Sequence, residues 1–131
     1  MNIQYASKAE TSYEYGCDLR RIYPWESLID PLWGSAIASV RAGENTAPHA
    51  HDEHETFIIL KGRGLMTIED ETAEVSSGDI IYIPPNLQHT IRNSSEEERL
   101  EFITIYWGSP EANERMLRMA EELVESRASR I

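Results

Sequence analysis

Most of the chain between residues 33 and 107 consists of short segments rich in β-branched and aromatic residues, separated by turn residues. No helical period interrupts this succession. Seven segments are predicted to form strands: Gly34–Arg41, Thr56–Lys61, Gly64–Glu69, Thr72–Val75, Asp79–Ile83, Gln88–Asn93 and Arg99–Trp107. Consecutive strands without an intervening helix predict an all-β fold, either a sandwich or a barrel.

The end of the chain has a different period and predicts a helix over residues 109–128. Ser109 is a favourable N-cap, Pro110 suits the first helical position, and Glu111 places an acid in the first turn. Apolar side chains then recur on one face, at Met116, Leu117, Ala120, Leu123 and Val124. We expect this face to pack on the outside of the barrel or on a second subunit.

The first 32 residues show no regular period. Residues 1–15 are expected to form an arm, either disordered or paired with a sheet edge of this or another subunit. Pro24 and Pro31 interrupt residues 17–30, which are expected to form a strand and a loop that cover the barrel. The expected organisation is a single domain over residues 1–131, with an arm and cover (1–32), a barrel core (33–107) and a C-terminal helix (109–128).

Composition excludes several classes of protein. The formal net charge of −11, from 23 acidic and 12 basic residues, disfavours binding to nucleic acids. Cys17 is the single cysteine, so an intrachain disulfide cannot form, and we expect this thiol to be inert and partly buried. There is no apolar run of membrane-spanning length and no secretory signal, which predicts a cytoplasmic protein with no membrane partner.

Histidine and glutamate residues gather near the middle of the chain. His49 and His51 are two residues apart, and on a strand such residues face the same side. Glu55 follows after a short polar turn, and His89 lies on another predicted strand. Three imidazoles and one carboxylate suit one divalent ion of Fe, Zn, Mn, Ni, Co or Cu, and the lack of thiolates disfavours a closed structural zinc site. The sequence therefore predicts a metal site of unassigned metal.

Two neighbours of Glu55 are alternatives to it. Glu53 or His54 could supply the fourth ligand instead, although the spacing favours Glu55. His54 lies in a polar turn between two acids and is expected to be solvated, or to contact a ligand rather than the metal. The three histidines of the predicted site could also be ordinary polar residues of loops or the surface.

Strand alternation orients the residues around His89. If His89 points into the barrel, Ile91 also points inward and Arg92 points outward. Further candidates for lining a pocket are Tyr82, Arg41 and Tyr106.

Residues 43–62 and 78–93 resemble the two sequence motifs of the cupin family. The first motif, G(X)5HXH(X)3,4E(X)6G, is filled at Gly43, His49, His51, Glu55 and Gly62. The second motif, G(X)5PXG(X)2H(X)3N, is matched at Gly78, Pro84, His89 and Asn93. The single departure is Asn86, where the motif has glycine. Because asparagine tolerates left-handed backbone, we expect this turn to survive.

The resemblance implies a fold, a ligand set and a type of activity. The fold would be the double-stranded β-helix, or jelly-roll barrel, of cupins, and family members commonly form homodimers. The implied metal ligands are His49, His51, Glu55 and His89. A small-molecule substrate would chelate the metal at an open position, in an enzyme of the dioxygenase type or of the Lewis-acid isomerase or lyase type. Glu55 could leave the metal to act as the catalytic base.

Two other functions are compatible with the same residues. Residues 33–40 and the segments around Pro84 and Tyr106 also resemble the cupin part of bacterial hydrazine synthetases, in which a zinc cupin works with a synthetase-like protein to form an N–N bond. Alternatively, the chain could be a non-enzymatic module that binds a metal or a small molecule, because fold does not fix function.

Overall fold

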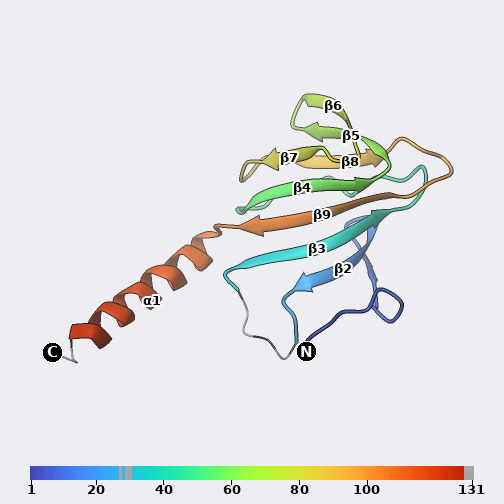
Figure 1. Cartoon of the computed structure of the whole chain (residues 1–131). Coiled ribbons are helices and arrows are strands. Elements are labelled where there is room, and N and C mark those ends of the chain that lie inside the picture. Colours follow the sequence, from blue (N-terminus) through green and yellow to red (C-terminus); the bar gives the residue numbers. More distant parts are fainter. Residues whose placement is uncertain (27, 29–30, 129–131) are drawn as a thin grey trace.

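The computed structural model describes residues 1–26, 28 and 31–128, which form a β-barrel followed by one helix (Figure 1). The elements are β1 (Ser12–Glu14), β2 (Cys17–Tyr23), β3 (Trp33–Val40), β4 (His54–Lys61), β5 (Arg63–Ile68), β6 (Glu71–Ser76), β7 (Ile80–Ile83), β8 (His89–Asn93), β9 (Leu100–Trp107) and α1 (Pro110–Ala128). All seven predicted strands are present as β3 to β9, with small shifts at their ends. The predicted all-β architecture with a C-terminal helix is therefore confirmed.

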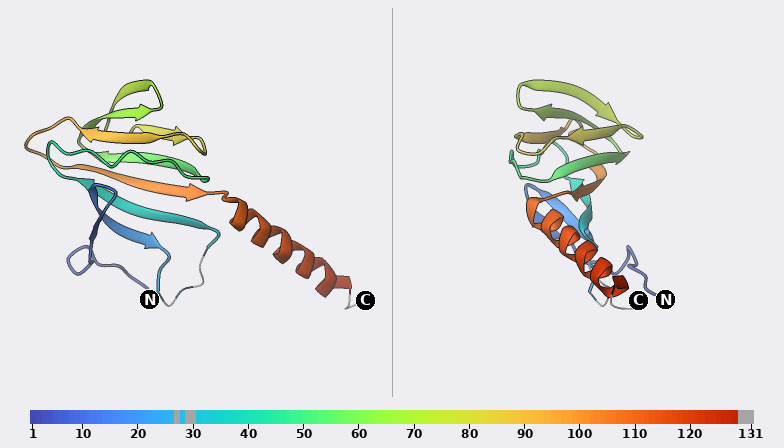
Figure 2. Two further views of the ribbon diagram at one scale, coloured as in Figure 1. Left: turned by 180° about the vertical axis from the view of Figure 1, so that it is seen from behind. Right: turned by 90° about the vertical axis from the view of Figure 1, so that its left-hand side faces the viewer.

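Two antiparallel sheets enclose the core. The larger sheet has the order β1-β2-β3-β9-β4-β7, and the smaller sheet has the order β6-β5-β8. Figures 1 and 2 show β5, β6 and β8 on one side of the molecule and β2, β3 and β9 on the other. Alternate residues of each strand point into the space between them, because successive side chains face opposite sides of a sheet. The largest fully buried apolar side chains are Val40, Ile59, Ile83, Ile91 and Leu100.

Residues 17–30, which were expected to cover the barrel, supply strand β2 of the larger sheet. β2 pairs with β3 over most of its length, and Cys17 and Leu19 belong to the core. The arm before it pairs with the edge of its own sheet, because β1 lies antiparallel to β2. The loop expected after β2 includes residues 27, 29 and 30, which lie outside the described residues.

Helix α1 begins as expected and then runs away from the barrel. The Ser109 hydroxyl oxygen accepts a hydrogen bond from the Ala112 backbone N–H at 3.1 Å, which is N-cap geometry. Within residues 110–128 no side chain is buried, and Figures 1 and 2 show the helix pointing outward from the end of β9. Of the two positions expected for its apolar face, the outside of the barrel is wrong, because the helix leads away from the sheet after Gly108 and Ser109, and packing on a second subunit stays a prediction. The homodimer stays a prediction. No described helix is long and apolar enough to cross a membrane.

Candidate metal centre

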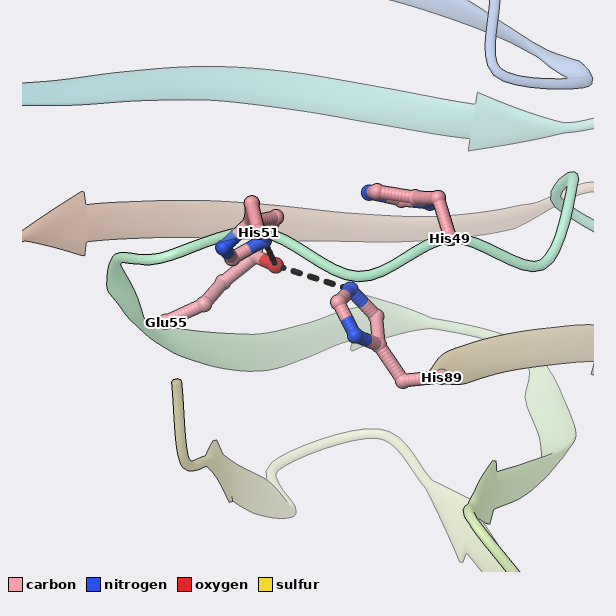
Figure 3. A group of neighbouring side chains, drawn as sticks. All are labelled: His49, His51, Glu55 and His89. Atoms are coloured by element: carbon pink, nitrogen blue, oxygen red, sulfur yellow. Dashed lines mark hydrogen bonds and ion pairs between the residues drawn. The ribbon is translucent and has the colours of Figure 1, made fainter. Parts of the chain in front are cut away.

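The four predicted ligands lie together at the end of the barrel interior. Each offers one nitrogen or oxygen atom, and these atoms all lie within 4.8 Å of one another (Figure 3). Glu55 lies in β4 and His89 begins β8. His49 and His51 lie in the loop before β4 rather than in a strand, since His49 pairs with His89 only through an isolated β-bridge. This loop is extended enough that both rings still reach the cluster.

Backbone carbonyls orient all three imidazole rings in the same way. In each ring, Nδ1 lies at hydrogen-bond distance from a carbonyl oxygen two residues away. The pairs are His49 with Ala47 at 3.0 Å, His51 with Glu53 at 3.1 Å, and His89 with Leu87 at 3.0 Å. A carbonyl oxygen can only accept, so Nδ1 carries the proton in each case. The neutral ring then has its free lone pair on Nε2, the atom available to a metal.

The free ring nitrogens meet a carboxylate oxygen, which is also an acceptor. Glu55 Oε1 lies 2.9 Å from His51 Nε2 and 3.1 Å from His89 Nε2. His89 Nε2 is buried and, among the described residues, has no contact with hydrogen-bond geometry. Two facing acceptors at these distances require either an extra proton or a cation between them. The second carboxylate oxygen accepts a hydrogen bond from the Thr104 hydroxyl, which fixes the carboxylate plane.

The spacing of the Glu55 oxygen from the His51 and His89 nitrogens fits a single metal ion. Two atoms bound to one ion at about 2.1 Å lie about 3.0 to 3.4 Å apart for angles between octahedral and tetrahedral. The observed separations of 2.9 and 3.1 Å from Glu55 to the two imidazoles are close to the lower end of this range. His49, His51, Glu55 and His89 could therefore hold a divalent ion. The same N/O donor set serves several metals and does not select one of them.

Burial and contacts act in opposite directions on the pKa values of the cluster. Burial alone would raise the pKa of Glu55, but contacts with His89, Thr104 and His51 outweigh burial and hold this pKa below its usual value. Burial alone would lower the pKa of His89, but the contact with Glu55 and the Leu87 carbonyl raise it. The carboxylate is therefore ionised at neutral pH, as a metal ligand has to be.

The alternative ligands lie outside the cluster. His54 Nδ1 is 2.7 Å from the Tyr82 hydroxyl, and the His54 ring stacks on Trp107 with centroids 5.5 Å apart. Glu53 contributes its backbone carbonyl to His51 rather than its carboxylate to the cluster. Burial raises the pKa of the Glu53 carboxyl group. His54 thus belongs to an aromatic group outside the metal site.

Strand alternation and turn chemistry agree with the sequence analysis. His89 and Ile91 are buried and Arg92 is exposed, as expected from their positions on β8. Asn86 has a φ of 66°, so asparagine adopts the left-handed turn in the place of the motif's glycine. Of the candidate pocket residues, Tyr106 lines the cavity. The aromatic ring of Tyr106 lies directly over Gly34, where an added Cβ would come within 2.1 Å of it.

A cavity of about 380 Å³ opens beside the cluster and extends to the inner face of β2. Its wall is mostly apolar, formed by Leu19, Ala36, Ala38, Phe57 and Phe102. Tyr15, Arg21 and Thr104 add polar groups that the sequence analysis did not identify. Tyr15 and Arg21 lie within residues 1–32, which have no regular period, so no sequence pattern predicted that they would face the site.

Cys17, the first residue of β2, also lines this cavity. Burial, with the nearby Asp18 and Glu14 carboxylates, raises the pKa of its thiol to about 11. The thiol is therefore protonated at neutral pH, whereas only the thiolate would bind a metal or react. Cys17 is not among the clustered donor atoms.

Comparisons with known proteins identify the family of this domain. The cupin domain model matches residues 36–106. The uncharacterized protein MJ1618 of Methanocaldococcus jannaschii is 49% identical over 59 residues, which are 44% of this chain and 47% of that protein. The H2HPP isomerase of Bacillus subtilis is 34% identical over 97 residues, covering 62% of this chain and 40% of the isomerase. The chain thus spans less than half the length of either curated relative.

A solved structure supports the same conclusion for the fold. The plu4264 protein of Photorhabdus luminescens superposes with a TM-score of 0.77 at 31% sequence identity, covering 92% of this chain and 97% of that chain. Together with the family match, this similarity confirms the predicted jelly-roll barrel.

Proposed function

This chain belongs to the cupin family, and we propose that it is a metal-dependent enzyme that acts on a small molecule at the cluster of His49, His51, Glu55 and His89. One observation carries the proposal: His51 and His89 hold Nε2 at 2.9 and 3.1 Å from one oxygen of Glu55, His49 offers a donor atom to the same cluster, and the Nδ1 of each ring is bound to a carbonyl. A divalent cation between these atoms would satisfy the facing acceptors, as an extra proton would, and a cavity of about 380 Å³ adjoins the cluster. When bound, a divalent ion would supply Lewis acidity, or redox chemistry if the ion is iron.

The residues around the cluster keep it open on one side. The four donors come from the loop before β4, from β4 itself and from β8, and the cavity lies toward β2, β3 and β9. A five- or six-coordinate ion would therefore keep positions free on the cavity side for a chelating substrate. The apolar wall lowers the polarity of the same space, which strengthens electrostatic interactions there.

Glu55 is the residue we assign as the general base. Its carboxyl pKa is held below the usual value, so the group is available as a carboxylate. The Thr104 hydroxyl holds Oε2, and Oε1 faces the cluster, so Oε1 would have to leave the metal before it could take a proton from a bound substrate. A base and a Lewis acid side by side suit proton transfer next to a carbonyl group, which needs no oxidant. The partial similarity to H2HPP isomerase favours this isomerase or lyase type over a dioxygenase.

The open coordination position can be tested with cobalt. Protein loaded with Co(II) is expected to show visible absorption bands that shift saturably when acetohydroxamate, a bidentate chelator, is added, because the chelator completes the coordination shell. Mass spectrometry of the same sample reports whether cobalt stays bound.

The control separates a site effect from free cobalt. Variant His89→Ala, treated identically, is expected to lose the bands. If the bands of the unaltered protein stay fixed at saturating acetohydroxamate while cobalt remains bound, the site is closed. The chain would then be a metal-binding module rather than an enzyme.

A further inference from the structure

The cavity beside the cluster has a positive charge on its opposite wall. Arg21 is the one arginine or lysine among the described residues that line it. Within the sheet, Arg21 pairs with Ala36, and Ala36 pairs with Thr104. The Thr104 hydroxyl in turn bonds to Glu55. One row of inward-facing residues therefore runs from the guanidinium group to the metal cluster.

Small side chains leave the space along this row open. Ala36 lies between Arg21 and Thr104, and Ala38 lies next to it on the same face of β3. Larger residues at these positions would fill the space between the guanidinium group and the cluster. The cavity can therefore accept a molecule that contacts both ends.

Arg21 already holds a carboxylate that comes from the chain itself. Its two terminal nitrogens lie 2.6 and 3.1 Å from the two oxygens of Glu14, the paired geometry by which arginine binds carboxylates. Hydrogen bonds from Arg21 and Ser12 lower the pKa of Glu14 to about 2, so both partners are charged at neutral pH. Side-chain exposures of 38% for Arg21 and 36% for Glu14 leave the pair accessible to a competing anion.

The residues that supply Glu14 also contact the metal cluster. Glu14 ends the three-residue edge strand β1, and the next residue, Tyr15, stacks on His49 with ring centroids 5.1 Å apart. The Tyr15 carbonyl accepts a hydrogen bond from the Ala47 N–H at 2.7 Å. The end of β1 thus places an internal carboxylate on Arg21 at the entrance of the cavity.

We propose that the cavity binds a small organic acid with a metal-binding oxygen group at one end and a carboxylate at the other, and that this carboxylate replaces Glu14 on Arg21. Binding of the ligand to the metal rests on the proposed function, whereas binding of its carboxylate to Arg21 rests on the contacts of Arg21 described above. The protein's net charge of −11 repels anions, so a carboxylate needs a local cation to bind here. Glu14 is then a built-in competitor for the ligand.

The test compares dicarboxylates with monocarboxylates of the same chain length. Succinate, glutarate and adipate, with butyrate, valerate and hexanoate as their partners, are titrated calorimetrically into zinc-loaded protein. The second carboxylate is expected to improve binding about tenfold in the unaltered protein, the size of a charge-assisted hydrogen bond. Variant Arg21→Gln is expected to abolish this advantage, and variant Glu14→Gln is expected to increase it.

The opposite effects of Arg21→Gln and Glu14→Gln on the binding advantage of dicarboxylates distinguish a binding site from a structural ion pair. If the pair only joins β1 to β2, both substitutions remove the same contact and change binding in the same direction, which would overturn the inference. An unchanged advantage in Arg21→Gln, or no binding of any dicarboxylate to unaltered protein, would also overturn it. Because the pair is exposed, either substitution should cost little stability, and circular dichroism checks that both variants fold.

Repeating the titrations without zinc separates this inference from the proposed function. Binding that does not depend on zinc, but still loses its dicarboxylate advantage in Arg21→Gln, would contradict the metal end and leave the Arg21 site in place. Binding that depends on zinc but is insensitive to Arg21→Gln would support the metal site and reject the Arg21 site.

Discussion

Replacing His89 with alanine is expected to lower zinc affinity by about a hundredfold or more, because losses of 10- to 100-fold already follow removal of residues that only support a ligand. His89 is buried, with 1% of its side chain exposed, and its Nε2 lies 3.1 Å from Glu55 Oε1. Removing the ring takes one of four donors from the cluster and leaves Glu55 with one imidazole partner fewer. Water can replace the donor atom only in part, because the surrounding barrel is apolar.

Competition against a chromophoric zinc chelator measures this change. The matched control is His54→Ala, which removes the one histidine outside the cluster. That ring contacts Tyr82 and Trp107, so its loss should leave zinc affinity unchanged. Equal affinities of the His89→Ala variant and the unaltered protein would reject His89 as a ligand, and a loss confined to His54→Ala would relocate the site.

Replacing Asn93 with aspartate is expected to destabilise the fold by about 3 kcal/mol or more, through the burial of an unpaired charge and the loss of donors. Asn93 is 1% exposed, and its Nδ2 donates to the carbonyls of Val40, Arg41 and Glu98 at 3.1, 3.3 and 2.7 Å. A carboxylate has no N–H to offer, so its oxygens would face these carbonyl oxygens. The substitution changes almost no volume, so cavity formation does not contribute.

Urea unfolding measures the free energy difference. Asn113→Asp is the control, because Asn113 is exposed in the first turn of α1, where an acid is tolerated well. The control should change stability by less than about 0.5 kcal/mol, as is usual at the surface. A similarly small effect for Asn93→Asp would show that the last position of the second cupin motif does not hold the β3 and β9 ends together.

Strands β3 to β9 were predictable because their signals are local, and the candidate ligands were predictable from short sequence motifs. Alternation and turn residues mark each strand, and the two-residue spacing of His49 and His51 places both rings on one side of an extended segment. The left-handed backbone conformation of Asn86 was also predictable, because asparagine tolerates the turn that the motif requires.

Other parts depended on contacts between distant segments. The pairing of Arg21 with Glu14 and its place opposite the cluster follow from the register of β2 on β3, which no local pattern sets. Residues 1–32 lack the alternation of apolar and polar residues that predicts a strand, although Cys17 and Leu19 are core residues. The direction of α1 depends on the short link at Gly108 and Ser109, while an amphipathic pattern predicts only that one face is apolar.

The X-ray absorption spectrum of protein loaded with one zinc per chain tests the central claim most directly, because it reports the atoms bound to the metal. The account predicts a nitrogen and oxygen shell at about 2.0 to 2.1 Å with outer scattering from three imidazole rings. That scattering should fall to two rings in His89→Ala. A sulfur shell at about 2.3 Å would instead place the ion on Cys17, and fewer than three imidazoles in unaltered protein would contradict the proposed metal centre.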